Sequence, residues 1–141
     1  MTARQQAITL IERYYAAFNA EDHAAMLACL SNDIAHDVNQ GKRETGKDAF
    51  RAFLARMANA YRERLDDIVI MANEDGTRAA AEFTVHGVYL AAEDGLPPAR
   101  GQSYTLAAGA FFTLEDDLIT RVSVCYNLAH WIAQVSADTA A

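Results

Sequence analysis

The chain has 141 residues, 52% of them hydrophobic, which is enough to bury one core in a single domain. Its net charge of −7 argues against a nucleic-acid partner, because nucleic-acid binding needs a clustered basic surface. Charged residues Arg4, Glu12 and Arg13 interrupt the N-terminal segment, so we expect no signal peptide, no membrane span and a cytoplasmic location. Cys29 and Cys125 lie in apolar stretches and should stay reduced there.

Helical periodicity dominates the first part of the chain. Apolar residues recur at helical spacing over residues 4–19, and Asp22 is a suitable N-cap for a shorter helix that carries Met26, Leu27 and Leu30. Residues 31–33 read as a turn. A third helix should start at Thr45 or Gly46 and end near residue 62.

The second part of the chain has the pattern of an antiparallel sheet. Strands are predicted over residues 65–72, 78–90, 102–114 and 118–126, with a hairpin turn at 73–76 and a proline-containing loop at 93–98. Asn127 can cap a closing helix that carries Leu128, Trp131, Ile132 and Val135. Helices first and hairpins afterwards indicate an α+β domain.

A polar stretch between the second and third helices is the first candidate site. Residues 34–46 read IAHDVNQGKRETG, so His36, Asp37 and Asn39 follow a short apolar start and precede an amphipathic helix. Titratable side chains at such a position are placed to face a cavity. A strand-to-loop turn explains the same residue types, because Asp, Asn and Gly favour turns for local reasons.

Four segments resemble the nuclear transport factor 2-like superfamily, and in particular its steroid Δ-isomerase and SnoaL-like polyketide cyclase branches. They are RYYAAFNAED (residues 13–22), HDVNQGKRETGKDAFRAF (36–53), FTVHGVY (83–89) and YNLAHWIAQV (126–135). The resemblance implies one cone-shaped domain over residues 1–141. In it, N-terminal helices pack on a strongly curved, mainly antiparallel sheet, and a short C-terminal helix closes the cone. The reaction does not follow from the fold, because one fold hosts many chemistries.

The steroid isomerases imply specific roles for residues of this chain. Their base is a carboxylate at the end of the first strand, and this resemblance places Asp37 there, or Val38 if no deletion is allowed in the preceding turn. Tyr14 matches the tyrosine that stabilises the oxyanion, and the alternative is a core residue whose hydroxyl is bonded to the backbone. The second acid of the steroid isomerases is missing, since Ala110 occupies its place. The polyketide cyclases need an aspartate base near the start of the last helix, and the nearest polar residue there is Asn127.

Strand alternation predicts which side chains face the cone. If the inner face of the first long strand carries Phe83, then His86 lies on the outer face and is an interface residue. Together with Asn39 beside Asp37 and Phe50 on the third helix, the expected ligand-contacting residues are Asn39, Phe50, Phe83, Val85, Tyr89, Ala110, Phe112 and Tyr126.

These features favour two functions. One is an isomerase, cyclase or lyase that acts by proton transfer on a hydrophobic carbonyl compound, with Asp37 as the base and Tyr14 as the oxyanion donor. The other is a non-catalytic binding protein for a small apolar ligand, and a dimeric scaffold with a filled cone remains a third. No cofactor and no metal are expected. A homodimer is expected through the outer sheet face, which carries Thr84, His86, Val88, Phe111 and Thr113.

Overall fold

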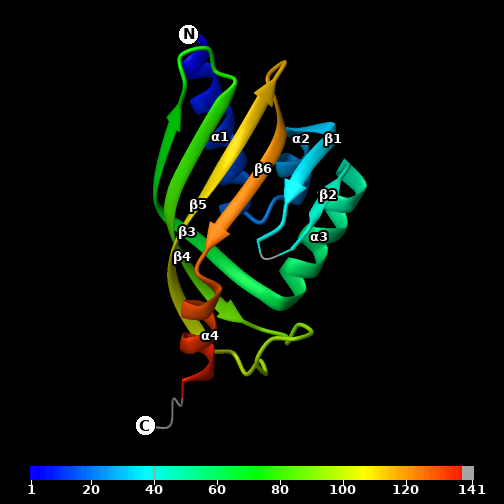
Figure 1. The fold of residues 1–141 in the computed structure, drawn as a ribbon, viewed down its shortest axis with the longest axis vertical. Helices are drawn as coiled ribbons and strands as arrows, with labels where there is room; N and C mark the ends of the chain where they lie inside the picture. The colour runs from blue at the N-terminus through cyan, green and yellow to red at the C-terminus, as the bar shows by residue number, and fades with distance from the viewer. Residues whose placement is uncertain (40, 138–141) are drawn as a thin grey trace.

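The described part of the chain folds into four helices and six strands (Figure 1). The computed structural model describes residues 1–39 and 41–137. In chain order the elements are α1 (Ala3–Asn19), α2 (His23–Ala28), β1 (Leu30–Asp37), β2 (Arg43–Thr45), α3 (Lys47–Ala60), β3 (Tyr61–Ala72), β4 (Arg78–Tyr89), β5 (Ser103–Glu115), β6 (Leu118–Tyr126) and α4 (Leu128–Ser136).

The six strands form one curved, unclosed sheet in the order β2-β1-β6-β5-β4-β3. Every neighbouring pair is antiparallel except β1 and β6, which run parallel. Helices α1 and α3 lie against the concave side, and α4 lies at the far end of the sheet beside β5 (Figure 1). The α+β cone expected from the sequence is therefore confirmed.

The long strands bury alternate side chains, as their sequence pattern predicts. In β4 the inner face carries Phe83, Val85 and Tyr89, all of them buried, while Thr84 and His86 on the other face are only half-buried. This alternation repeats in β5. Since α1 packs on β3 and β4, the buried inner face forms one hydrophobic core with the helices.

Two predicted boundaries differ from the structure. Residues 31–33 belong to β1 and not to a turn, and α2 ends before Leu30. Pairing with β6 explains this, because the Ile119 backbone N–H donates to the Cys29 carbonyl at 2.8 Å and β1 begins there. Helix α3 stops at Ala60, and β3 begins at Tyr61 instead of residue 65. Long-range strand pairing overrides local propensity at both places.

Helix α4, the C-terminal helix that the sequence predicted, packs against β5 at one end of the sheet. Asn127 caps it by accepting a hydrogen bond from the His130 backbone N–H at 3.0 Å. Gln134 exchanges two hydrogen bonds with the backbone of Thr105 on β5, at 2.8 and 3.0 Å. The helix is thus fixed to the sheet. None of the helices described here is long and apolar enough to cross a membrane.

Candidate functional site

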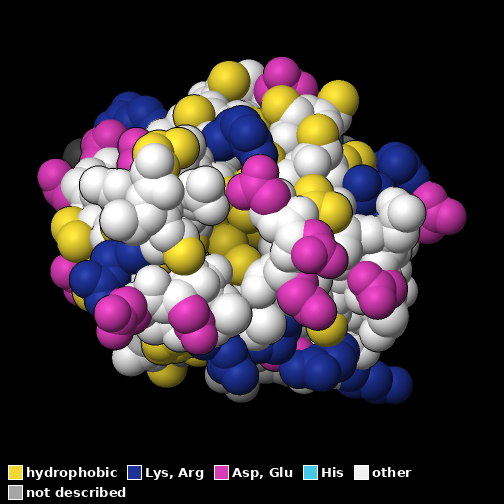
Figure 2. All heavy atoms as spheres, turned by 90° about the horizontal axis from the view of Figure 1, so that it is seen from above, with side chains coloured by type: hydrophobic (Ala, Val, Ile, Leu, Met, Phe, Trp, Pro, Cys, Tyr) yellow, Lys and Arg dark blue, Asp and Glu magenta, His cyan; other side chains and the backbone are white. Residues whose placement is uncertain are grey.

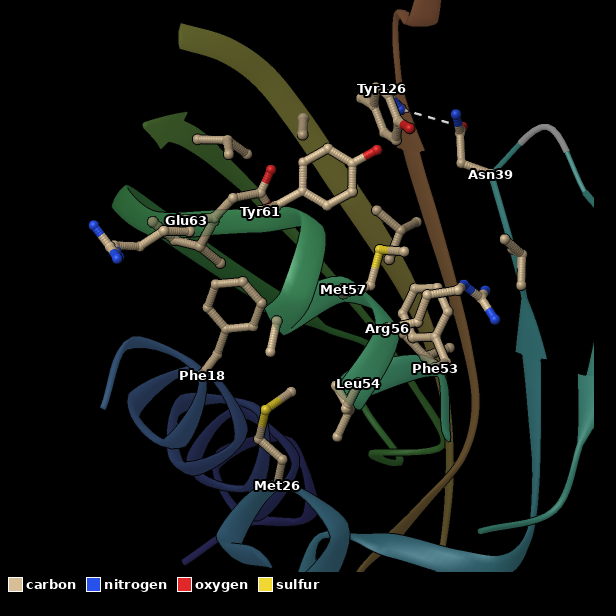
Figure 3. A pocket seen from close by; sticks show the side chains of 18 of the residues that line it. Phe18, Met26, Asn39, Phe53, Leu54, Arg56, Met57, Tyr61, Glu63 and Tyr126 are labelled. Atoms are coloured by element: carbon tan, nitrogen blue, oxygen red, sulfur yellow. Dashed lines mark hydrogen bonds between the residues drawn. The ribbon is translucent and has the colours of Figure 1, made fainter. Parts of the chain in front are cut away.

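A cavity of about 990 Å³ opens between the helices and the concave face of the sheet. This volume lies at the upper end of the range of small-molecule sites. Most of its lining is apolar: Phe18, Met26, Phe53, Leu54 and Met57 come from the helices. Figure 3 shows Tyr61, Glu63 and Tyr126 on one side of the pocket, with Phe18 and Met26 across it. The cavity suits a hydrophobic molecule that carries a few polar groups.

The surface view from above shows a depression near the centre of that face (Figure 2). Hydrophobic side chains are visible at its bottom, and acidic side chains lie along one side of it. Basic side chains are interspersed with acidic ones around the rest of this face.

Six of the ten residues that were expected to be catalytic or ligand-contacting line the cavity, and four do not. The lining residues are Tyr14, Asn39, Phe50, Phe83, Val85 and Tyr126. Tyr89, Ala110 and Phe112 lie on the inner face but in the packed core. The Tyr89 hydroxyl donates to the Pro97 carbonyl at 2.8 Å, and Phe112 packs edge-on against Tyr14. Facing the cone is therefore not sufficient for contact with a ligand.

Asp37 does not face the cavity, contrary to the orientation expected from the sequence. Its carboxylate binds Arg43 at 2.7 and 3.2 Å and Arg121 at 3.4 Å, and Arg121 in turn donates to Thr113 on the outer face of β5. The hydrogen bond from Arg43, with further help from Arg121, holds the pKa of Asp37 below its usual value. Asp37 is an ion-paired surface carboxylate and not a desolvated base.

His36, the neighbour of Asp37, faces the cavity instead. Its side chain is buried between two aromatic rings, with ring centroids 4.9 Å from Phe50 and 4.5 Å from Phe53. Burial is the main cause that lowers the pKa of His36, and Arg56 adds to the effect, whereas Glu44 and Asp37 oppose it. The imidazole is therefore neutral at pH 7 and can accept a proton.

A carboxylate lies behind the His36 ring. His36 and Glu44 are opposite each other in the β1–β2 ladder, and His36 Nδ1 lies 3.9 Å from Glu44 Oε1. Both atoms are buried, and neither forms a hydrogen bond within the described part of the chain. A small approach of the two side chains would bond Nδ1–H to Glu44, which leaves Nε2 as the basic nitrogen.

The strand pattern itself contained the signal for His36. Ile34 is a buried core residue of β1, so the alternation that starts there places His36 and Val38 on the inner face and Asp37 on the outer one. Both His36 and Val38 line the cavity. Counting from the family motif placed Asp37 on the wrong face, whereas counting from Ile34 gives the observed orientation.

Two tyrosines of α1 also line the cavity. Tyr14 and Tyr15 are buried, and burial raises the pKa of both hydroxyls. Neither hydroxyl forms a hydrogen bond with another described residue, unlike those of Tyr61, Tyr89 and Tyr104. A neutral Tyr14 hydroxyl without a protein acceptor is available to a ligand oxygen.

Glu63 and Tyr61 are lining residues that the sequence prediction missed. Tyr61 donates to Glu93 at 2.7 Å, and Glu93 also pairs with Arg56 at 3.7 Å. Burial raises the pKa of the Glu63 carboxyl. Both residues were assigned to the end of a helix or to the link after it. The alternating order of Tyr61, Glu63 and Leu65 was the signal for a strand.

The described residues contain no group of three or more His, Cys, Asp or Glu side chains arranged to hold a metal ion. The cavity instead combines a neutral imidazole, a carboxyl group and free tyrosine hydroxyls inside an apolar wall. Such a set can take up, donate and stabilise charge at a carbonyl group.

Comparison with known families identifies the class of protein. A profile that describes a SnoaL-like domain matches residues 11–122. The chain therefore belongs to the SnoaL-like family, within the nuclear transport factor 2-like superfamily. A search of curated proteins found no match.

Several crystal structures are similar over nearly the whole chain. A "putative polyketide cyclase" from Xanthomonas campestris pv. campestris is 56% identical with a TM-score of 0.92, covering 95% of this chain and 99% of its own. One from Pseudomonas putida is 57% identical with a TM-score of 0.91, covering 96% and 98%. An LEH-like epoxide hydrolase from M. tuberculosis, 17% identical with a TM-score of 0.73 over 96% of this chain and 89% of its own, shares the fold.

Proposed function

We propose that this protein is an enzyme that transfers a proton within a hydrophobic carbonyl compound held in the cavity, in the manner of a cyclase or isomerase. His36 is the base and Tyr14 is the hydrogen-bond donor to the oxyanion. Membership of a family of cyclase- and isomerase-type proteins supports this proposal. So does a cavity that is apolar and large enough for a compound of several rings.

The observation that carries the proposal is the environment of His36. His36 is 4% exposed and packs between two phenylalanines. Burying a polar ring without hydrogen bonds costs folding free energy, so this position favours a functional role for the imidazole nitrogen. Because its pKa is lowered, the imidazole has a free lone pair at neutral pH. Glu44 behind it favours the imidazolium that forms when the proton arrives.

The reaction begins when His36 removes a proton from the carbon beside the ligand carbonyl. The electron pair of that C–H bond moves into the carbonyl and gives an enolate, whose oxygen accepts a hydrogen bond from Tyr14. Burial keeps the Tyr14 hydroxyl protonated, so it donates a hydrogen bond without losing its proton. In a β,γ-unsaturated ketone the enolate is conjugated, and His36 returns the proton to its γ-carbon, which isomerises the double bond. Alternatively, the enolate carbon attacks a second carbonyl in the same molecule, a ring closes, and the alkoxide that forms takes up a proton.

Exchange of deuterium tests the first step without knowledge of the natural substrate. Purified protein is incubated in D₂O with a panel of hydrophobic ketones, including 2-tetralone and a 1,3-diketone, and deuterium uptake is measured by mass spectrometry. We expect catalysed exchange with at least one ketone. His36→Gln should lower its rate by a hundredfold or more, which is the usual contribution of a general base.

Asp37→Asn is the matched control, because it removes a carboxylate from the adjacent position on the outer face. It should leave the exchange rate within about twofold. Binding of the ketones without exchange above the protein-free rate would refute the proposal and leave a binding protein for apolar ligands. Equal rates in His36→Gln and the wild type would refute the role of His36.

A further inference from the structure

Three residues on three neighbouring strands form one straight row across the sheet. Glu63 on β3 pairs with Gly87 on β4, and Gly87 pairs with Tyr104 on β5. The Tyr104 side chain crosses the middle strand, and its hydroxyl donates to Glu63 Oε2 at 2.5 Å. A side chain on β5 thus holds a carboxyl group that is two strands away.

Gly87 is what makes this contact possible. A Cβ atom built at Gly87 would overlap the Tyr104 ring at Cζ, Cε2 and the hydroxyl oxygen. Its backbone is ordinary strand, so the position needs glycine for space and not for conformation. Trp131 of α4 packs edge-on against the same ring at 5.9 Å between centroids and supports it from the side of α4.

The second oxygen of Glu63 is left for the cavity. Glu63 lines the cavity, and its sole side-chain partner among the described residues is Tyr104. Neither a lysine nor an arginine of the described chain forms an ion pair with it. The titratable and charged groups that line the cavity near it include Tyr61 and Arg62 on the same strand, Tyr126 at the end of β6, and Glu93 and Asp94 in the β4–β5 loop.

We propose that Glu63 is a second acid–base residue that contacts the ligand, and that Tyr104, reaching it across Gly87, is the positioning residue for its carboxyl group. The role in turnover rests on the proposed function, whereas the contact with a ligand does not. Glu63 lies on β3 and His36 on β1, and strands β4, β5 and β6 separate the two in the sheet. Both residues, the proposed base His36 and the proposed acid Glu63, line the same cavity.

Protonated Glu63 acts as a general acid. It gives its proton to a ligand oxygen that lies beside it and gains negative charge during the reaction. In a ring closure, His36 takes the proton from carbon, the new carbon–carbon bond forms, and the attacked carbonyl oxygen takes the proton from Glu63. His36 ends with one proton more and Glu63 with one fewer, and exchange with water restores both. Each transfer is balanced without any oxidant or reductant.

Carbon-13 NMR of protein labelled in its glutamate carboxyl carbons tests the contact directly. The Glu63 resonance is identified by its loss in Glu63→Gln, and its pH titration is followed with and without 2-naphthol, an apolar probe with one hydroxyl group. Glu63 should titrate above the usual glutamate value of about 4.3, because burial raises its pKa. The probe should shift the Glu63 resonance and leave that of Glu82, on the exposed side of β4, unchanged.

Two variants test the role of Tyr104. Tyr104→Phe removes a hydrogen bond that favours the ionised carboxylate, so the Glu63 pKa should rise further. Gly87→Ala should displace the tyrosine ring and have the same effect. Tyr89→Phe is the matched control: it deletes a buried hydroxyl bonded to Pro97 and should not move the Glu63 titration.

The inference is overturned if 2-naphthol does not shift the Glu63 resonance. It is also overturned if Glu63 titrates with the same pKa in Tyr104→Phe and in the wild type. Where the ketone panel shows exchange, Glu63→Gln should lower ring-closing or isomerising turnover by a hundredfold or more. It should also abolish the decline of kcat at high pH, while Tyr104→Phe moves that decline upward. If no ketone is exchanged, the proposed function fails, and the NMR titration still decides whether Glu63 contacts a ligand.

Discussion

The buried imidazole of His36 should make the stability of this protein depend on pH. Burial lowers the pKa of His36 in the folded state, whereas the unfolded chain keeps a value of about 6.5. Below pH 6.5 the unfolded state therefore binds more protons than the folded state, and the free energy of unfolding falls. The His36 contribution is complete above pH 6.5 and is lost as the pH drops towards the folded-state pKa.

The size of the effect follows from linkage. One group changes the free energy of unfolding by at most about 1.4 kcal/mol per pH unit between its two pKa values. Between pH 7.5 and 5.5 the His36 term therefore amounts to at most about 1.4 kcal/mol, because the unfolded histidine titrates across half of that interval. Urea unfolding at both values, followed by circular dichroism, measures the difference.

His36→Gln should remove this term, so the variant loses less stability than the wild type between pH 7.5 and 5.5. His130→Gln, which deletes an exposed histidine on α4, is the control and should follow the wild type. A His36→Gln variant with an undiminished pH dependence would show that the folded state also protonates His36. The neutral imidazole required of the base would then be refuted.

Other contacts predict further effects. Asp37→Asn should change the free energy of unfolding by less than about 1 kcal/mol in urea titrations, since its two arginine partners form part-exposed ion pairs. Asn19 exchanges two hydrogen bonds with the Leu65 backbone, at 2.9 and 3.0 Å, so Asn19→Ala should cost about 1–3 kcal/mol in the same assay. Phe111 is 51% exposed on the outer face, in one row with Met71. We expect a dimer through this face in sedimentation, and a monomer for Phe111→Glu; a monomeric wild type would refute that.

Local pattern determined most of the elements. Helical periodicity located α1 and α3, Asp22 and Asn127 cap their helices as predicted, and the turn before β4 contains Gly76 at a φ of 72°. These features depend on residues that are near each other in the chain, so a single sequence is sufficient to find them. Alternation likewise assigned the inner and outer faces of β4 and β5.

Long-range pairing decided what the pattern could not. Residues 31–33 have turn propensity but are drawn into β1 by β6, some ninety residues later in the chain. The position of Asp37 was inferred from motif spacing, and only the pairing of β1 with β2 and β6 shows that it meets Arg43 and Arg121 on the outer face. The contact between Tyr104 and Glu63 needs three strands in one register, and no local signal encodes it.

The sequence by itself therefore determined the α+β class, the family and the residue types available for chemistry. The tertiary structure decided which of them share the cavity, because that depends on the face each strand presents and on the depth of the packed core. Tyr14 and Asn39 line the cavity as expected, while His36 replaces Asp37 there and Glu63 joins it from a strand that was predicted too short. A shift of one residue reverses the face of a strand side chain, so the residue type that the strand presents to the cavity depends on strand register and cannot be read from the motif alone.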